Sequence, residues 1–299
     1  VITVTSFGFC SYNSNSVVSA DTVSWPSGPG LVAETAVMID ASTGSVLFDK
    51  KCHQKMYPAS ITKIMTALLT IENCNLDDTV TFSQSAIDTL EPEAANIGAV
   101  VGEEMSVKDC LYALMLQSAN EVASALAEHV SGSIEEFAKL MNKRAKQAGA
   151  NDAHFANACG LFNKKHYVTA YDMAKIMQAA LQYPVFREII NSSSYTLPTD
   201  NKRKEPLTIS QRHQMVQPWN SFHYDGIIGG KTGFVNESGT TLVTSAQRDG
   251  MTLITVVLNS PGTNSYVDTT ALLDFGFKNF KLTNVSENDT RFENKSTFT

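Results

Sequence analysis

The chain has 299 residues, of which 43% are hydrophobic and 18% are charged, and its formal net charge is −7 at pH 7. These values are ordinary for a globular protein with one large domain or two smaller ones. The acidic balance argues against binding to nucleic acid or to an anionic membrane surface, and no apolar run is long enough to predict a transmembrane helix.

Two segments are predicted to precede the folded domain. Residues 1–20 are apolar at the start and end in Val18-Ser19-Ala20. A small-x-small sequence of this kind is typical of a signal-peptidase site, so we interpret residues 1–20 as the remnant of a secretory signal peptide. The alternative is a Ser- and Asn-rich leader without fixed structure. Residues 21–34 are rich in Ser, Pro and Gly, which predicts a linker.

The predicted domain, residues 35–281, begins with a β-hairpin and a helix. Strands are expected at 36–40 and 45–49, because two β-type runs flank a short turn sequence. A helix is expected over 60–73, where apolar residues recur at the spacing of a buried helical face. Pro58 stands just upstream, where a helix can begin but cannot extend backwards.

A block of helices is expected next. Ser106, Ser133 and Thr169 each precede an apolar helical pattern and have an acidic residue three positions later. This arrangement is typical of helix N-termini. The first of these helices is expected to break at 118–120, and another helix is expected to begin near Glu121.

The last third of the chain changes to a strand pattern. Residues 191–225 are polar and predict irregular structure. Strands are expected at 225–234, 240–245 and 251–258, the last two joined by a turn of the Asp-Gly type. A closing helix is expected at 266–280.

This order of elements predicts an α+β fold, in which an antiparallel sheet has a helical block inserted between its N-terminal and C-terminal strands. Residues 282–299 are interpreted as a C-terminal tail, or as the start of a truncated second domain.

The cysteines and histidines form no recognisable metal or redox motif in the sequence. The five cysteines are Cys10, Cys52, Cys74, Cys110 and Cys159, and no Cys-x-x-Cys pair occurs. Neither a zinc site nor a thioredoxin-like motif is therefore predicted. Cys110 falls on an apolar helical pattern and is expected in the core. The histidines, His166 included, have no partner at a metal-ligand spacing, so no metal and no other cofactor is expected.

Three short motifs could carry chemistry. Ser60 and Lys63 are three residues apart at the start of a helix, so their side chains point the same way. Ser118-Ala119-Asn120 falls in a predicted break between helices, and Lys231-Thr232-Gly233 falls on a glycine-flanked strand. Each motif alone also has a structural explanation, since Ser and Asn cap helices and a lysine can protect a sheet edge.

Together, in this order, the motifs match the set that defines serine β-lactamases and penicillin-binding proteins. The chain resembles the low-molecular-mass penicillin-binding proteins that are serine-type D-Ala-D-Ala carboxypeptidases, with a β-lactamase/transpeptidase-like fold. The resemblance extends from about Ala36 to Phe280 and includes the Gly160-Leu161 pair, residues 166–172 and residues 231–239.

The resemblance implies acyl transfer without a metal. Ser60 would attack the carbonyl between two D-alanines, and Lys63 would accept its proton. Partial burial and the second ammonium of Lys231 should lower the pKa of Lys63. Ser118 would relay a proton to the leaving amine, and Asn120 would bond both the substrate backbone and Lys63.

The third motif would bind the substrate. Lys231 would provide positive potential, and Thr232 would bind the terminal carboxylate. Gly233, together with Gly229 and Gly230, was expected to let a substrate strand lie close to the backbone. The N–H groups of Ser60 and Phe234 would form the oxyanion hole. The implied partners are peptidoglycan stem peptides, with β-lactam antibiotics as inhibitors, and the implied location is the cell wall or the outer face of the cytoplasmic membrane.

The chain departs from the family pattern at several positions. Ala119 stands where the motif set has Asp, and Ala158-Cys159 stands where the family usually has Pro and His. Members often place an arginine before the closing helix to bind the substrate carboxylate. That region here reads Asn264-Ser265-Tyr266, and the nearest arginine, Arg248, falls in a predicted turn. The second carboxylate contact is therefore unassigned.

Two other functions remain open at this stage. A class A β-lactamase needs a glutamate downstream of the middle motif, whereas Glu91-Pro92-Glu93 lies upstream and is interpreted as a loop. The chain could also be a cell-wall peptide sensor that has lost catalysis, although all the expected catalytic side chains are present.

Overall fold

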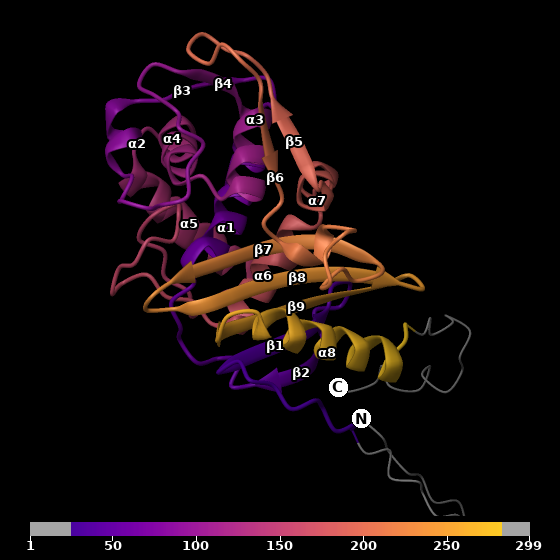
Figure 1. Ribbon diagram of the computed structural model, residues 1–299. Helices are drawn as coiled ribbons and strands as arrows, with labels where there is room; N and C mark the ends of the chain where they lie inside the picture. Colours follow the sequence, from indigo (N-terminus) through magenta and orange to yellow (C-terminus); the bar gives the residue numbers. More distant parts are fainter. Residues whose placement is uncertain (1–24, 283–299) are drawn as a thin grey trace, which may run out of the picture.

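The computed structural model describes residues 25–282 (Figure 1). The predicted signal-peptide remnant at 1–20 lies outside the described residues, and so does the predicted tail apart from its first residue. Residues 25–34 contain neither helix nor strand. The Val32 and Ala33 N–H groups donate to the carboxylate of Asp268 at 3.0 and 2.7 Å. In the described residues, no helix has the length and apolar character needed to cross a membrane.

A five-stranded sheet in the order β2-β1-β9-β8-β7 forms the base of the fold, and all its strand pairs are antiparallel. This confirms the predicted sheet, in which N-terminal and C-terminal strands pair. The strands are β1 (Thr35–Asp40), β2 (Val46–Lys50), β7 (Ile227–Val235), β8 (Gly239–Arg248) and β9 (Met251–Ser260).

Both faces of this sheet are covered, because side chains alternate between two hydrophobic clusters. On β1, Val37 and Ile39 belong to the core shared with the helical block, whereas Ala36 and Met38 face the cluster under α8. Helix α8 (Asn264–Asn279) begins two residues earlier than expected and lies across the sheet, opposite the helical block (Figure 1).

The helical block contains the helices that the sequence predicted, and their caps are as expected. Ser106, Ser133 and Thr169 each accept a hydrogen bond from the backbone N–H three residues later. The elements are the 3₁₀ turn η1 (Ala59–Thr62), α1 (Lys63–Asn73), β3 (Thr79–Thr81), α2 (Gln84–Asp88), β4 (Glu104–Ser106), α3 (Val107–Tyr112), the π-helical segment η2 (Ala113–Gln117), α4 (Asn120–Ser131), α5 (Ile134–Ala148) and α6 (Ala170–Ala180).

The region after α6 is more regular than predicted. Pro184 starts a further helix, α7 (Pro184–Asn191), at the position where a missing N–H costs nothing. The prediction of irregular structure over 191–225 is wrong in part. A hairpin of β5 (Ser194–Leu197) and β6 (Leu207–Ser210) lies there, and a 3₁₀ turn, η3 (Gln214–Val216), follows. These strands are only four residues long, so their alternation is too short to recognise in the sequence.

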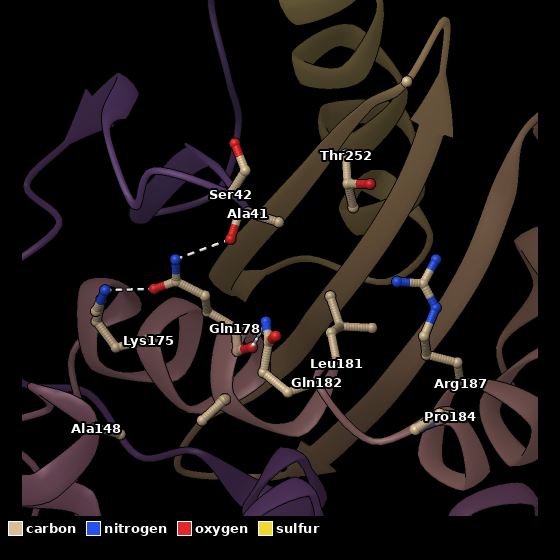
Figure 2. Close-up of a pocket in the computed structure, with 12 residues that line it drawn as sticks. Ala41, Ser42, Ala148, Lys175, Gln178, Leu181, Gln182, Pro184, Arg187 and Thr252 are labelled. Atoms are coloured by element: carbon tan, nitrogen blue, oxygen red, sulfur yellow. Dashed lines mark hydrogen bonds between the residues drawn. The ribbon is translucent and has the colours of Figure 1, made fainter. Parts of the chain in front are cut away.

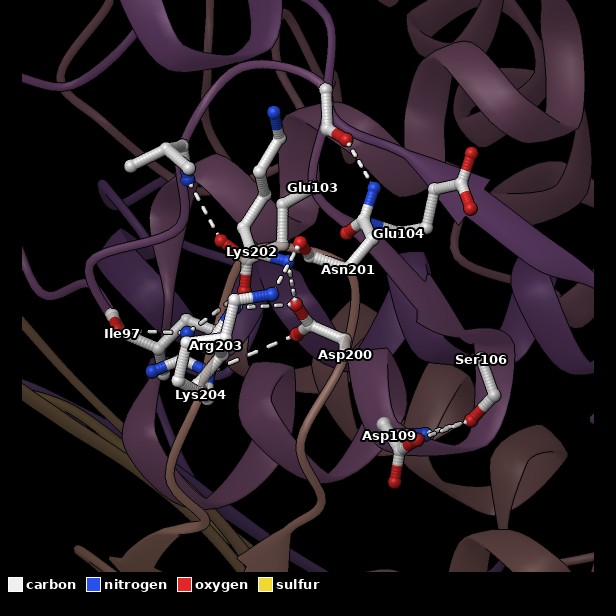
Figure 3. A network of polar contacts seen from close by, with 12 residues as sticks. Ile97, Glu103, Glu104, Ser106, Asp109, Asp200, Asn201, Lys202, Arg203 and Lys204 are labelled. Carbon is white, nitrogen blue, oxygen red and sulfur yellow. Dashed lines mark hydrogen bonds and ion pairs between the residues drawn. The ribbon is translucent and has the colours of Figure 1, made fainter.

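The tip of this hairpin is fixed to the helical block by a polar network (Figure 3). Arg203 donates to Glu103 at 3.0 Å and to the carbonyl of Ile97 at 3.3 Å. Asn201 donates to the carbonyl of Gly102 at 2.7 Å and accepts from the N–H of Glu104 at 2.9 Å. The hairpin therefore links this network to the segment after β6, and that segment lies at the candidate site.

Candidate active site

The three motifs meet at one cleft with a volume of about 670 Å³. Ser60 comes from η1, Ser118 from the break before α4, Asn120 from the first position of α4, and Thr232 from β7, and all of them line the cleft. Its wall also includes Gly233, Phe234, Glu91, Glu93, Arg212, Cys159, Gly160 and Tyr266. Lys63 and Lys231 are fully buried next to these residues.

The nucleophile is held by a strained turn. Ala59, the residue before Ser60, has a φ of 52°, which is uncommon for a residue with a side chain. Gly160 packs directly against this turn with a φ of 92°, and a Cβ there would lie 1.9 Å from the Ala59 carbonyl oxygen. Position 160 must therefore be glycine, because a side chain there would displace the turn that places Ser60.

Lys63 lies in contact with the Ser60 hydroxyl. Its Nζ is 3.1 Å from Ser60 Oγ, 2.6 Å from Asn120 Oδ1 and 2.7 Å from the Cys159 carbonyl oxygen. The carbonyl and amide oxygens can only accept, so they bind two N–H groups of the amine. When Lys63 is neutral, its lone pair is left for the Ser60 hydroxyl. This geometry suits a base that takes the serine proton.

The pKa of Lys63 is lowered to about 8, mainly by burial; the Glu121 carboxylate acts to raise it and the Arg212 guanidinium acts to lower it. The expected lowering is thus present, but it comes from burial and not from Lys231, which was predicted to contribute. Burial also lowers the pKa of Lys231 well below the usual lysine value, and the charges of Lys63 and Arg212 act in the same direction. Because Lys63 lowers the pKa of Lys231 and Arg212 acts on both, the two amines share one electrostatic environment.

Ser118 and Asn120 are positioned by an irregular helix end. The π-helical segment η2 ends at Ser118, whose φ is 65°. π-helical segments of this kind frequently occur at functional sites. Ser118 is buried, and its Oγ has no hydrogen-bond partner among the described residues. The Asn120 N–H donates to the Ala95 carbonyl at 2.8 Å, which connects the motif to the loop on the other wall of the cleft.

The glycines of β7 do not act as expected. A Cβ on Gly229 would lie 2.2 Å from the Ile190 carbonyl oxygen, and a Cβ on Gly230 would lie 1.9 Å from that of Val243. The space beside these two glycines is thus filled by the protein's own backbone, so the prediction that they admit a substrate strand is wrong. A Cβ on Gly233 would also meet the protein's own atoms, but this glycine lines the cleft, unlike Gly229 and Gly230.

No sequence motif predicted a role for Arg212. This residue follows β6, its side chain lines the cleft, and its charge affects both active-site lysines. Its backbone N–H donates to the Leu116 carbonyl at 3.3 Å. Arg248, the nearest arginine in sequence to the expected position, is engaged elsewhere, because it donates to the Asp225 carbonyl and stacks on Tyr224. A motif search could not find Arg212, since it lies in a segment predicted as irregular.

His166 has the structural role that was predicted. Its Nδ1 accepts from the Ala156 N–H at 3.4 Å, so Nε2 carries the proton and donates to Thr62 Oγ1 at 3.0 Å. Burial lowers the pKa of His166 to about 3, which keeps the ring neutral. The ring thereby connects the segment before α6 to the turn that carries Ser60.

Residues Glu91 and Glu93 lie in a loop, as interpreted from the sequence, but this loop forms one wall of the cleft. A second hollow of about 780 Å³ lies elsewhere, beside the β1–β2 turn and helix α6 (Figure 2). There Gln178 donates to the Ala41 carbonyl at 2.9 Å and accepts from Lys175. None of the motif residues lines this hollow, so it is not the candidate active site.

Residues 22–262 match the sequence profile of the peptidase S11 family, D-alanyl-D-alanine carboxypeptidase. The chain belongs to this family. Among its curated relatives, DacF of Bacillus subtilis strain 168 is 35% identical over 254 residues, which cover 83% of this chain and 63% of DacF. DacB2 of Mycobacterium tuberculosis is 33% identical, with 87% of each chain covered. Both relatives are D-alanyl-D-alanine carboxypeptidases.

A solved structure supports the same assignment of fold. The crystal structure of the Streptomyces K15 DD-transpeptidase superimposes with a TM-score of 0.77 and 29% identity, and the match covers 85% of this chain and all of that one. The S11 chain described here therefore has the penicillin-binding-protein fold that its three motifs predicted.

Proposed function

We propose that this chain is a serine-type D-Ala-D-Ala carboxypeptidase that removes the terminal D-alanine from peptidoglycan stem peptides. Family membership supports the reaction, and the 3.1 Å contact between Lys63 Nζ and Ser60 Oγ supports the catalytic roles. That contact is the central observation, because a serine hydroxyl needs a neighbouring base to become a nucleophile.

In acylation, Ser60 Oγ attacks the carbonyl carbon of the penultimate D-alanine while its proton passes to neutral Lys63. The C–N bond to the terminal D-alanine then breaks, and the leaving nitrogen takes a proton through Ser118. Ser118 Oγ has no hydrogen-bond partner within residues 25–282, so it is available for this relay. Water subsequently hydrolyses the ester and regenerates Ser60. Backbone donors at Ser60 and Phe234 would stabilise the oxyanion, each worth about 3–4 kcal/mol in comparable sites.

The substrate carboxylate has three candidate partners in or beside the cleft. Thr232 and Arg212 line the cleft, and Lys231 is buried next to it. We assign Thr232 and Arg212 to direct contact with the carboxylate and Arg212 to the positive potential that attracts it, to which Lys231 adds when it is protonated. The assignment of Arg212 fills the position that the sequence left open.

Acylation by a labelled penicillin, followed by peptide mass mapping, tests the proposal. The label is expected on Ser60, and Ser60→Ala should abolish both labelling and the release of D-alanine from a peptide ending in D-Ala-D-Ala. Labelling at another residue, or D-alanine release by Ser60→Ala, would contradict the assignment.

The β-lactamase alternative can be tested, because Glu91 and Glu93 line the cleft. A glutamate near the acyl-enzyme could activate the deacylating water. We expect penicillin to be released slowly and Glu91→Gln and Glu93→Gln to leave the release rate unchanged. Rapid penicillin turnover that either variant abolishes would favour the β-lactamase.

The sensor alternative makes a different prediction, namely binding of the peptide without release of D-alanine by the wild-type chain.

The substrate is part of the cell wall, so we also propose that the protein acts outside the cytoplasm, after export directed by the predicted signal peptide. Detection of the mature protein in a cell-wall or membrane fraction would test the location.

A further inference from the structure

A cysteine, an aspartate and a histidine come together on the helical block, away from the cleft. A thiol sulfur of Cys74, a carboxylate oxygen of Asp78 and a ring nitrogen of His129 all lie within 4.8 Å of one another. Among residues 25–282, this is the one group of three such side chains with ligand atoms this close. No sequence motif indicates this group, because His129 comes from a different helix.

The group lies at the C-terminal ends of two packed helices. Cys74 is the residue that ends α1, and His129 lies in the last turn of α4. The other ends of these helices carry Lys63 and Asn120, the first residues of α1 and α4. At 1.5 Å per residue, helices of 11 and 12 residues separate the two ends by roughly 16–18 Å. The group is therefore distinct from the cleft.

Helix ends of this kind favour a cation. Carbonyl groups without intrahelical partners give the C-terminus of a helix a partial negative charge, and two such ends meet here. Asp78 is also oriented, since the Asn75 N–H donates to its Oδ2 at 2.8 Å. Its Oδ1 has only a 3.4 Å contact from the Asn75 side chain. In metal sites, the ligating side chains are typically oriented by hydrogen bonds to neighbouring groups such as the backbone.

The donor set selects the type of metal. Thiolate sulfur, imidazole nitrogen and carboxylate oxygen together suit zinc, whereas calcium and magnesium prefer oxygen ligands. Tetrahedral zinc with these ligands needs donor separations of roughly 3.3–3.7 Å, so side-chain rotations of about 1 Å would close the site. Glu128 precedes His129 in sequence, but its carboxylate already accepts hydrogen bonds from the hydroxyls of Ser83 and Ser85. We therefore assign the fourth zinc ligand to water.

We propose that Cys74, Asp78 and His129 bind a zinc ion that joins the ends of α1 and α4. On binding, the Cys74 thiol releases its proton to solvent and a sulfur–zinc bond forms. The ion takes no part in acyl transfer. It stabilises the folded state by connecting the two helices whose opposite ends hold the catalytic lysine and asparagine.

Thermal unfolding of the full chain with and without zinc tests the proposal. A site that binds the folded state at 100 times its Kd should raise the Tm of a domain of this size by about 5 °C or more. Zinc should bind with a stoichiometry of one per chain, and magnesium or calcium should produce no shift. His129→Gln and Cys74→Ser should each keep the metal-free Tm of the wild type and lose the zinc-induced rise.

Alkylation gives a readout that is independent of stability and of activity. Cys52, Cys110 and Cys159 are buried, whereas Cys74 is only half-buried. Zinc should slow the modification of Cys74 by N-ethylmaleimide at least tenfold, as mapped by mass spectrometry, and His129→Gln should remove this protection.

Two variants serve as matched controls. His53 and Asp152 form an exposed His–Asp pair, 4.0 Å apart, so His53→Gln removes an imidazole of the same kind without touching the proposed site. Cys52→Ala removes a buried thiol that the proposal does not use. Both should retain the full zinc effect. The proposal is overturned if zinc changes neither Tm nor alkylation in the wild type, or if His129→Gln responds as the wild type does.

Discussion

Gly233 lies so close to Ser60 that a Cβ atom on Gly233 would come within 2.9 Å of the Ser60 amide nitrogen. The same atom would lie 2.5 Å from Thr241 Oγ1 and 3.0 Å from the Pro58 carbonyl oxygen. Strand β7 can therefore pass the nucleophile turn at this distance only with glycine at this position. The spacing between the nucleophile and the substrate-binding strand is set by a missing side chain.

We predict that Gly233→Ala slows acylation of Ser60 by penicillin about 100-fold or more. The added methyl group must push β7 away from the turn, and small displacements of a preorganised site cost this much. Stopped-flow measurement of the acylation rate constant checks the prediction. Gly30→Ala is the matched control, since a Cβ there meets nothing within 4 Å. A rate within twofold of wild type for Gly233→Ala would contradict it.

The pH dependence of acylation should follow Lys63. Its pKa is lowered to about 8, and only the neutral amine can accept the serine proton. Below pH 8 the neutral fraction falls roughly tenfold per pH unit, so the acylation rate constant should rise with pH and level off above about 8. A pH–rate profile with a neutral substrate analogue, measured over a range in which the protein stays folded, tests this expectation.

Replacing Glu121 should shift the midpoint of the pH–rate profile in a definite direction. Its buried carboxylate raises the pKa of Lys63, so Glu121→Gln should move the midpoint of the pH–rate profile to lower pH. Glutamine has nearly the same shape, and its side-chain oxygen can still accept from the Ile97 N–H, which is 2.7 Å from Glu121 Oε1. An upward shift of the midpoint would show that another charge controls Lys63.

Arg212 should recognise the carboxylate of the substrate. We predict that Arg212→Gln raises KM for a D-Ala-D-Ala peptide at least tenfold, because a charge-assisted hydrogen bond is lost. The same variant should change KM for the corresponding C-terminal amide much less, since the amide lacks the negative charge. Arg248→Gln is the control, because this arginine binds the Asp225 carbonyl outside the cleft. Equal losses for acid and amide would assign Arg212 a purely structural role.

The parts that could be predicted from the sequence are those with local signals. The capped helices and the strands β8 and β9 carry long periodic patterns, and Ser60 and Lys63 share a helix face by spacing alone. The joint position of Ser60, Asn120 and Thr232 in one cleft followed from the family resemblance, because no local pattern brings distant segments together.

The parts that were missed depend on tertiary contacts. Arg212 follows a four-residue strand that exists because its hairpin packs against the helical block. The role of Gly229 was misjudged because the sequence cannot show that Ile190 occupies the space beside it. The contacts among Cys74, Asp78 and His129 likewise require the packing of α4 against α1.

The network at the hairpin tip should contribute strongly to stability. Arg203 and Glu103 are 3.0 Å apart, and only 15% and 2% of their side chains are exposed (Figure 3). Removing one partner leaves the other charge buried without compensation, which commonly costs about 3–5 kcal/mol. We therefore predict that Arg203→Met lowers the free energy of unfolding by about 3 kcal/mol, as measured by urea denaturation.

An exposed ion pair in the same protein offers the comparison. Lys139 and Glu136 are 2.5 Å apart on the surface of α5, where their side chains are 72% and 57% exposed. Lys139→Met should change the free energy of unfolding by no more than about 0.5 kcal/mol, because solvent screens the pair. The double variant Arg203→Met/Glu103→Leu should recover part of the stability lost in Arg203→Met, since it removes the buried Glu103 carboxylate that Arg203→Met leaves without its partner. Equal costs for Arg203→Met and Lys139→Met would show that the hairpin tip is not fixed by the buried pair.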